Sequence, residues 1–266
     1  MKIRHVLMLS MLLPLLAACS KTEAPEAPAT PAATAPAPTE ASAAATPSAP
    51  AEAAAPAPDA PNNNPVVAPQ GPAPVAGTDY IEISGGQPWQ PLNGKIEVVE
   101  MFNYICPACY AFDPALRNWK AKQPADVNVI YVPAQFRPDF VQYAKAFYAA
   151  ESLGIQDRSH QAVYEAIHVK HSIPAEGDPV DEAKIAAFYT QYGVSAQQFL
   201  DTMKSFAVAG RINKANQFAL RSKIEGTPSL VVNGKYLVKG RSWEDMLRIA
   251  DHLIAGERAA QPPAAQ

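Results

Sequence analysis

Apolar positions along this chain follow two periods, and each period predicts a different kind of element. Alternating and β-branched runs predict strands over residues 80–83, 95–103 and 127–132. Helical spacing then predicts helices over residues 139–153, 160–168, 181–192 and 196–223. The folded part therefore begins with strands and continues into a long helical block.

The C-terminal part returns to strands and ends in a helix. Apolar runs at 228–232 and 236–238 flank Asn233-Gly234, and Asn-Gly between apolar runs favours a tight β-hairpin. A capping-box spacing predicts the last helix over residues 242–256. The order of elements alone predicts a mixed α/β domain.

The N-terminus predicts export. The basic sequence MKIRH at 1–5 precedes an apolar run that is shorter than the about 20 residues needed to span a bilayer. The run ends in LAAC at 16–19, which resembles a bacterial lipobox. We expect residues 1–19 to be a lipoprotein signal peptide with lipidation at Cys19; an ordinary signal peptide cleaved near Ala18 is the alternative.

Either signal places the protein in an oxidising compartment, and we expect the periplasm. A triacylated Cys19 would anchor the protein firmly to a membrane, because stable anchoring needs more than one acyl chain. Ser20 after the cysteine favours the outer membrane by resemblance to enterobacterial sorting rules. The choice between outer and inner membrane stays open.

Composition sets the domain boundaries. Residues 20–77 are rich in Ala, Pro, Thr, Ser and Glu, and they bury too little apolar surface to offset the entropy of ordering. We expect a disordered linker there, either a stalk or a plain spacer, and a disordered tail at 259–266. Residues 78–258 are expected to form one domain with a helical insert at about 138–222.

Charge excludes one class of function. The 25 acidic and 22 basic residues give a net charge of −3, and no basic stripe accompanies the aromatic residues. Nucleic-acid binding therefore has no support. We expect a monomer.

The chain's chemistry is concentrated in one pair of cysteines. Cys106-Pro107-Ala108-Cys109 follows the strand at 95–103, and Cys19 is the only other cysteine of the chain. Two thiols make an incomplete zinc set, so a redox pair without a metal or cofactor is the main interpretation. A redox pair after the first strong strand of an interrupted α/β order predicts a thioredoxin-like fold.

A metal-binding module is the alternative from a different class of function. His168 and His171 lie three residues apart and would have to complete the ligand set with the cysteines. The simpler interpretation of both histidines is that they are solvated residues at a helix end.

The passage from strand to helix predicts different roles for the two thiols. Cys106 would be the N-cap and Pro107 the first helical residue, where a missing N–H costs nothing. The free amides of Ala108 and Cys109 and the helix dipole then favour a thiolate on Cys106. We predict that Cys106 attacks and that a buried, less acidic Cys109 resolves. Pro114 is expected to kink this helix.

Two further residues could support the pair. Pro228 opens a strand after Thr227, and a cis Thr227-Pro228 bond would bring backbone against the sulfurs, although a trans turn proline is the commoner case. Glu100 shares a strand face with Ile96, and in a central strand it would be a buried acid able to exchange a proton with Cys109. An exposed strand-end glutamate is the alternative for Glu100.

These residues together resemble the DsbA family of thiol:disulfide oxidoreductases, in the thioredoxin superfamily. The resemblance rests on Glu100 six positions before Cys106, on the motif at 106–110, and on the two segments 226–228 and 232–236. It implies a thioredoxin fold with a helical insert, a cis proline at Pro228 and a buried acid at Glu100.

The resemblance also implies partners. Reduced exported polypeptides would be the substrates, and an inner-membrane quinone-linked thiol oxidase would reoxidise the dithiol. Pro107, Ala108 and Thr227 would contact the substrate chain. A reductase or isomerase of the same fold, or a tethered binding domain without redox activity, are the alternatives.

The chain departs from the best-known members of this family at two positions. Ala108 stands where they carry histidine, and Thr227 stands where many oxidases carry valine. We therefore expect a reduction potential between those of thioredoxin, about −270 mV, and of the enterobacterial oxidase, about −120 mV.

Overall fold

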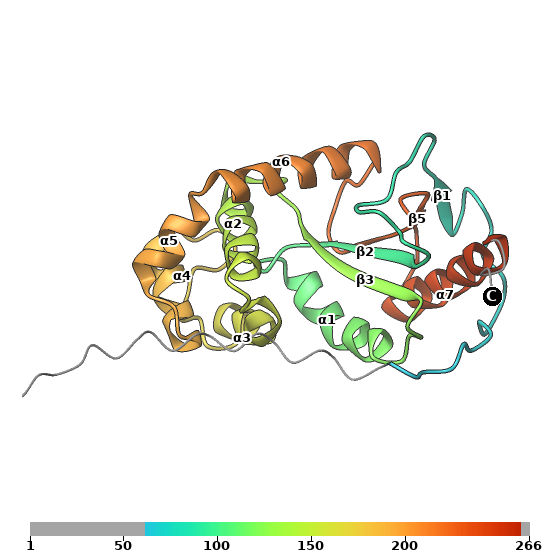
Figure 1. Ribbon diagram of the computed structural model, residues 1–266, viewed down its shortest axis with the longest axis horizontal. Helices are drawn as coiled ribbons and strands as arrows, with labels where there is room; N and C mark the ends of the chain where they lie inside the picture. Colours follow the sequence, from blue (N-terminus) through green and yellow to red (C-terminus); the bar gives the residue numbers. More distant parts are fainter. Residues whose placement is uncertain (1–61, 262–266) are drawn as a thin grey trace, which may run out of the picture. The chain divides into compact units, whose positions relative to one another are not determined.

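The computed structural model describes residues 62–261 (Figure 1). The predicted signal peptide at 1–19, its lipidation site Cys19, the first part of the predicted linker and the end of the predicted tail lie outside the described residues. Among residues 62–261, no helix is long and apolar enough to cross a membrane.

The described residues contain a mixed sheet whose strands match the predicted ones. Its order is β1-β5-β4-β2-β3, in which β2 pairs in parallel with β3 and antiparallel with β4. β2 is therefore an inner strand, and all seven of its residues are buried. The strands are β1 Tyr80–Glu82, β2 Ile96–Phe102, β3 Val127–Pro133, β4 Ser229–Val232 and β5 Tyr236–Val238.

Two helices pack along the sheet, and a group of helices lies beside it (Figure 1). α1 Pro107–Lys120 and α7 Trp243–Ala260 share a buried cluster with Ile96 and Val98 of β2. The helical insert comprises α2 Pro138–Ser152, α3 Gln156–His168, α4 Glu182–Tyr189, the 3₁₀ turn η1 Thr190–Tyr192, α5 Ala196–Met203 and α6 Phe206–Arg221.

The prediction of one helix over 196–223 is wrong. Ser205 lies between α5 and α6 in an extended conformation, and its hydroxyl accepts a hydrogen bond from the amide of Val208. Such a cap satisfies an amide at the start of a new helix, so the chain begins α6 instead of continuing α5. The predicted helix at 181–192 likewise ends as a 3₁₀ turn before Gly193, whose φ is 88°.

The hairpin forms as the sequence predicts. Asn233 and Gly234 have φ angles of 49° and 65°, the left-handed values that a two-residue primed turn needs. The Asn233 side chain also accepts a hydrogen bond from the amide of Glu97 at 2.7 Å. The turn is therefore fixed to the start of β2 as well as to its own strands.

The predicted disordered linker ends earlier than residue 77. Residues 62–77 lie on the domain, where the side-chain amides of Asn62 and Asn64 donate 2.8 Å hydrogen bonds to the carbonyls of Gln123 and Ala121. These carbonyls lie just beyond α1, where a helix leaves its last carbonyls without helical partners. Composition misses this docking, because two asparagines rather than an apolar pattern make the contacts.

Replacing Asn62 and Asn64 together by alanine should lower the free energy of unfolding. The three hydrogen bonds lie near the surface, so we expect a loss of about 1 kcal/mol, well below the sum of isolated bonds. Urea unfolding of the double variant and of the unchanged protein measures the loss. An unchanged midpoint would mean that the segment does not stabilise the domain.

Candidate active site

The two cysteines lie where β2 passes into α1, and both are in the dithiol form. Cys106 is the N-cap of α1, with an extended backbone, and its sulfur accepts a hydrogen bond from the Cys109 amide at 3.4 Å. Cys106 is 8 % exposed and Cys109 is fully buried. The predicted N-cap position of Cys106 and the burial of Cys109 are therefore confirmed, and Cys106 is itself buried but for a small exposed fraction.

Their surroundings separate the acidities of the two thiols. The hydrogen bond with the Cys109 thiol is the largest cause that lowers the pKa of Cys106, to about 6, although burial opposes it. The Thr227 side chain and the amides of Ala108 and Cys109 lower this pKa further. Burial, followed by the hydrogen bond with Cys106, raises the pKa of Cys109 well above its usual value. At neutral pH Cys106 is the available nucleophile.

Alkylation of the reduced protein should show a single thiol titrating near pH 6. Only the thiolate reacts with iodoacetamide, so the rate at Cys106 should rise to a plateau above that pH, whereas Cys109 should remain unmodified. Mass spectrometry at a series of pH values measures both sites. A midpoint near 8.5, the value of a free cysteine, would contradict the geometry of this N-cap.

Thr227 and Pro228 are far from Cys106 along the chain, but the fold brings them against it. The Cys106 thiol donates to the Thr227 carbonyl at 3.5 Å, and the Thr227-Pro228 bond is cis. The predicted cis bond is thus confirmed. Thr227 and Pro228 are half-buried, Ala108 is half-buried and Pro107 is exposed, so all four residues partly face solvent around the reactive sulfur. Their role in substrate binding stays a prediction.

Replacing Thr227 by valine should raise the pKa of Cys106. Valine keeps the branched shape but removes the hydroxyl group, and a hydrogen bond with the Thr227 side chain is one of the causes that lower this pKa. The alkylation midpoint of the variant, compared with that of the unchanged protein, measures the shift. A midpoint that does not move would show that the hydroxyl group does not stabilise the thiolate.

Glu100 lies on β2, an inner strand of the sheet. It pairs in register with Tyr131 of β3 and with Leu230 of β4, and it is 1 % exposed. Its Oε1 atom has no hydrogen-bond partner among the described residues. Burial, followed by the charges of Asp113 and Cys106, raises its pKa well above the usual value. The prediction that Glu100 is buried is confirmed, and its role in proton transfer stays a prediction.

The chain matches known proteins in sequence and in fold. A family model described as a DSBA-like thioredoxin domain matches residues 97–250. Over 189 residues the chain is 41% identical to the thiol:disulfide interchange protein DsbA of Pseudomonas aeruginosa, covering 70% of this chain and 86% of that protein. The chain belongs to the DsbA family.

Solved structures of family members agree. The crystal structure of the oxidoreductase DsbA from Xylella fastidiosa has a TM-score of 0.68 at 46% identity, covering 70% of this chain and 98% of that one. The crystal structure of Pseudomonas aeruginosa DsbA has a TM-score of 0.63 at 40% identity, covering 70% and 95%. The predicted thioredoxin-like fold with a helical insert is confirmed, and this DsbA-family chain is a thiol:disulfide oxidoreductase.

Three residues around the dithiol of this DsbA-family enzyme were missed by sequence reasoning. Tyr104, Asp113 and His160 are buried, and His160 lies 2.9 Å from the Tyr104 hydroxyl and 3.4 Å from Asp113 Oδ1. Asp113 could have been found, because it follows Cys109 by four residues and so lies on the same helix face. Nothing in the sequence signals His160, which the insert brings to the site from α3.

The interpretation of His168 as a solvated residue is wrong. Its Nε2 donates to the Tyr104 carbonyl at 2.7 Å, and its ring stacks on Tyr110 with centroids 4.7 Å apart. His168 thus fastens the insert to the loop before Cys106, whereas His171 is exposed. Within residues 62–261, no group of three or more His, Cys, Asp or Glu side chains is placed to hold a metal ion.

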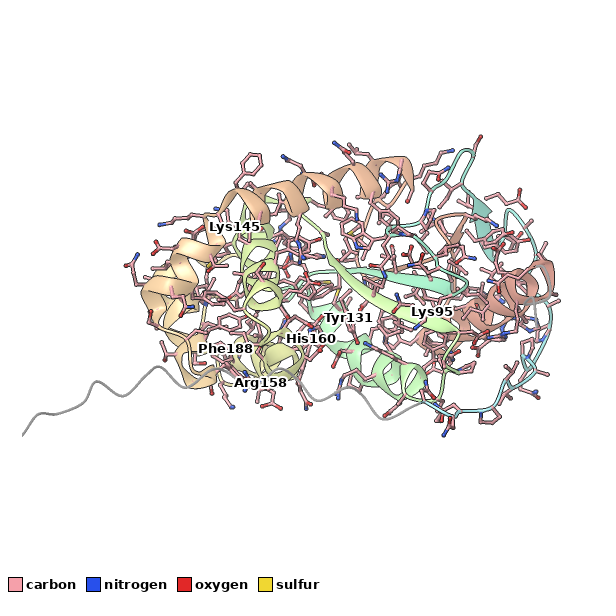
Figure 2. The ribbon with its side chains drawn as sticks, viewed as in Figure 1. Lys95, Tyr131, Lys145, Arg158, His160 and Phe188 are labelled. Atoms are coloured by element: carbon pink, nitrogen blue, oxygen red, sulfur yellow. The ribbon has the colours of Figure 1, made fainter. Side chains whose placement is uncertain are left out.

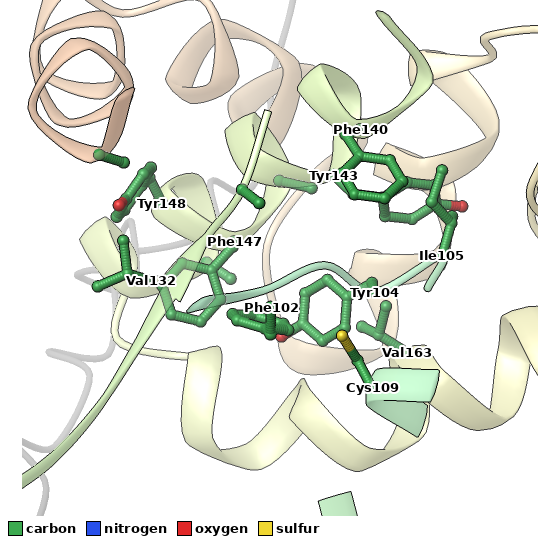
Figure 3. Close-up of a cluster of buried hydrophobic side chains, with 14 of the residues drawn as sticks. Phe102, Tyr104, Ile105, Cys109, Val132, Phe140, Tyr143, Phe147, Tyr148 and Val163 are labelled. Carbon is green, nitrogen blue, oxygen red and sulfur yellow. The ribbon is translucent and has the colours of Figure 1, made fainter. Parts of the chain in front are cut away.

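The resolving thiol lies in an apolar surround. Figure 3 shows Cys109 beside Phe102, Tyr104 and Val163, which come from β2, from the loop after it and from α3. This surround excludes water from Cys109, which is the physical cause of its raised pKa. Pro114 lies inside α1, and the helix continues past it to Lys120.

Proposed function

We propose that this DsbA-family enzyme introduces disulfides into reduced polypeptides exported to the periplasm. The acidity of Cys106 is the observation that supports this direction of electron flow, from the substrate to the enzyme. A low thiolate pKa stabilises the dithiol form over the disulfide, and a stabilised dithiol makes the disulfide form an oxidant. The pKa of about 6 lies between the thioredoxin value of about 7 and the enterobacterial value of about 3.5.

The proposed reaction consists of two exchanges. A substrate thiolate attacks the Cys106 sulfur of the Cys106–Cys109 disulfide, and Cys109 leaves as a thiolate that takes a proton from Glu100. A second substrate thiolate then attacks the substrate sulfur of the mixed disulfide, and Cys106 leaves as a stable thiolate. The substrate loses two electrons and gains a disulfide, and the enzyme becomes a dithiol.

Substrate binding would use the surface around Cys106. The half-buried Thr227 and Pro228 are proposed to pair with an extended substrate backbone, and the exposed Pro107 and half-buried Ala108 would contact its side chains. Reoxidation is proposed to occur at an inner-membrane quinone-linked thiol oxidase. The enzyme would act as a monomer.

The redox state in cells tests the direction of electron flow. Rapid acid quenching followed by alkylation with a large maleimide separates the dithiol from the disulfide on a gel. We expect the disulfide form to predominate, and strains without a quinone-linked thiol oxidase should accumulate the dithiol. A dithiol in unperturbed cells would instead identify a reductase or isomerase.

Anchoring is a separate part of the proposal. The LAAC sequence at 16–19 supports processing as a lipoprotein, with Cys19 acylated and the folded domain held near a membrane. Cys19→Ala should move the protein from the membrane fraction to the soluble periplasmic fraction. If the unchanged protein is already soluble, an ordinary signal peptide cleaved near Ala18 is the correct alternative.

A further inference from the structure

One turn along α1 from Cys109 begins a cluster of buried polar side chains that the exchange steps above do not use. Asp113 extends from α1 one turn after Cys109, His160 comes from α3, and Tyr104 comes from the loop between β2 and α1. Asp113 and His160 are 4 % and 5 % exposed. Burying such groups is unfavourable unless they are paired, so their placement calls for an explanation.

The hydrogen bonds of His160 fix where its proton lies. Its Nδ1 is 2.9 Å from the Tyr104 hydroxyl and 3.2 Å from the Gln156 side-chain nitrogen. With the Gln156 amide in this orientation its nitrogen donates, so Nδ1 is assigned as the acceptor and the neutral ring as carrying its proton on Nε2. That nitrogen faces Asp113.

Asp113 and His160 are in contact but do not form a well-aligned hydrogen bond. Asp113 Oδ1 lies 3.4 Å from His160 Nε2, and neither atom has a well-aligned hydrogen bond within the described residues. The other oxygen of Asp113 is held by Arg117 at 2.7 Å. Burial alone would raise the pKa of Asp113, but His160 and Arg117 together lower it. Asp113 is thus an ionised acceptor with one oxygen available to a mobile proton.

The same cluster reaches Glu100. Glu100 is the register partner of Tyr131, and side chains of paired residues point to the same face of a sheet. The His160 ring lies 4.6 Å from the Tyr131 ring and 5.6 Å from that of Phe102, two residues after Glu100 on the same face. The charge of Asp113 is also, after burial, the largest cause of the raised pKa of Glu100.

His160 also lines a cleft on the outer side. Figure 2 shows His160 and Tyr131 near the middle of the molecule, and the two rings form part of the wall of a cleft of about 330 Å³. The other residues that line it include Arg117, Lys120, Gln156 and Asp157. The titratable groups that face His160 are Tyr104, Asp113, Tyr131 and Tyr164, from the loop, α1, β3 and α3.

We propose that His160 and Asp113 form a proton relay between the water of this cleft and Glu100. When Cys109 leaves the disulfide as a thiolate, it takes a proton from Glu100, which becomes a buried carboxylate. The His160 ring takes a proton from water in the cleft on Nδ1 and becomes an imidazolium, and the hydroxide left behind is neutralised by the solvent. The Nε2 proton of the ring then passes to Asp113 and from Asp113 to Glu100, which returns the ring to a neutral form. The reverse sequence removes the Cys109 proton when the dithiol is reoxidised. The relay rests on the proposed role of Glu100.

The test measures rate and equilibrium separately in the full-length enzyme. His160→Gln keeps a hydrogen-bonding side chain but cannot carry a proton as imidazole does. Quenched-flow reduction of the disulfide form by dithiothreitol at pH 7 should be about tenfold slower, because proton transfer through a positioned side chain contributes at least that much. The equilibrium constant with glutathione should stay within about twofold, since a relay alters only the rate.

Two further variants separate a relay from a structural role. His160→Ala should be slow in the same assay and should recover in the presence of free imidazole, which the cleft can admit. His171→Gln, a change at an exposed histidine, should react at the unchanged rate. Asp113→Asn should also be slow. A normal rate for His160→Gln, or a slow rate without imidazole rescue of His160→Ala, would overturn the relay.

Glu100→Gln distinguishes failure of the relay from failure of the acid. If Glu100→Gln is slow and His160→Gln is not, the relay is wrong and the proposed acid stands. If Glu100→Gln reacts at the unchanged rate, the acid itself is wrong and the relay falls with it. If the acid and the relay are both correct, the variant that combines Glu100→Gln with His160→Gln should be no slower than Glu100→Gln alone, because the two groups act in one path.

Discussion

Replacing Cys109 by serine is expected to stop the enzyme at a mixed disulfide with its substrate. Cys106 keeps its N-cap position, and the serine hydroxyl group can still donate to its thiolate, so attack on a substrate disulfide continues. In this reverse exchange Cys109 is the thiol that would release the adduct. The variant also cannot form the Cys106–Cys109 disulfide that oxidises substrates, so turnover should fall by at least about a thousandfold, as it does when an essential catalytic group is lost. Non-reducing gels of periplasmic extracts should show covalent adducts.

Cys106→Ser is the matched control. It retains Cys109, whose thiol is buried and whose pKa is raised, so it should form no adducts and should also lose turnover. Adducts on Cys106→Ser that are absent from Cys109→Ser would mean that the roles of the two thiols are reversed. The assignment rests on the N-cap position of Cys106 and on the opposite directions in which the pKa values of the two thiols are shifted.

Replacing Glu100 by glutamine or leucine is expected to stabilise the folded protein and to slow thiol–disulfide exchange. Glu100 is buried with an unpartnered oxygen. Leucine removes this polar group, whose burial costs about 1–3 kcal/mol, whereas glutamine removes only the cost of ionising the buried acid. The loss of the acid should slow the exchange by about tenfold to a hundredfold. Urea unfolding and quenched-flow reduction of the same preparations measure both effects.

The stabilisation should also depend on pH. In the folded protein the pKa of Glu100 is raised above 4.5, the ordinary value of a glutamate. The folded form therefore binds the proton more tightly than the unfolded form. The unchanged protein therefore loses stability as pH rises above 4.5, until the folded pKa is passed. Glu100→Gln does not titrate, so its advantage should grow over that range.

Glu97 provides a control on the same strand. It is as buried as Glu100, at 1 %, but its carboxylate accepts hydrogen bonds from the amides of Trp89 at 2.6 Å and Gln90 at 3.1 Å. Glu97→Gln should therefore destabilise the protein and leave the rate of exchange unchanged. A destabilised Glu100→Gln with an unchanged rate would contradict the proposed role of Glu100.

The sequence predicts the reactive centre well, because local rules determine it. The spacing of Cys106 and Cys109, a proline at the first helical position and a preceding apolar strand suffice to place one thiol at a helix N-cap. Asn233-Gly234 likewise predicts its hairpin from two residues. Each of these features depends on neighbours along the chain, so no knowledge of the tertiary fold is needed.

The groups that surround the centre depend on long-range packing, and the sequence does not reveal them. His160 lies 47 positions after Asp113 in the chain. It reaches Asp113 only because the insert places α3 against α1. The end of the linker was missed for a similar reason, since Asn62 and Asn64 find their partners about 60 residues away. A polar contact at such separation leaves no periodic pattern.

The two departures from the best-known family members oppose each other in this site. Ala108 provides no positive charge beside Cys106, which leaves the thiolate less stabilised. Thr227 provides a hydrogen-bonding side chain where many oxidases carry valine, and this lowers the pKa of Cys106. The pKa of Cys106 is about 6, and we therefore expect an intermediate oxidising power.

Equilibration of the purified enzyme with glutathione tests the central claim most directly. The fraction of disulfide at a series of glutathione ratios gives the reduction potential of the Cys106–Cys109 pair. We predict a value between about −270 mV and about −120 mV, which would make the disulfide form an oxidant stronger than thioredoxin. A value at or below the thioredoxin potential would contradict the account and would indicate a reductase.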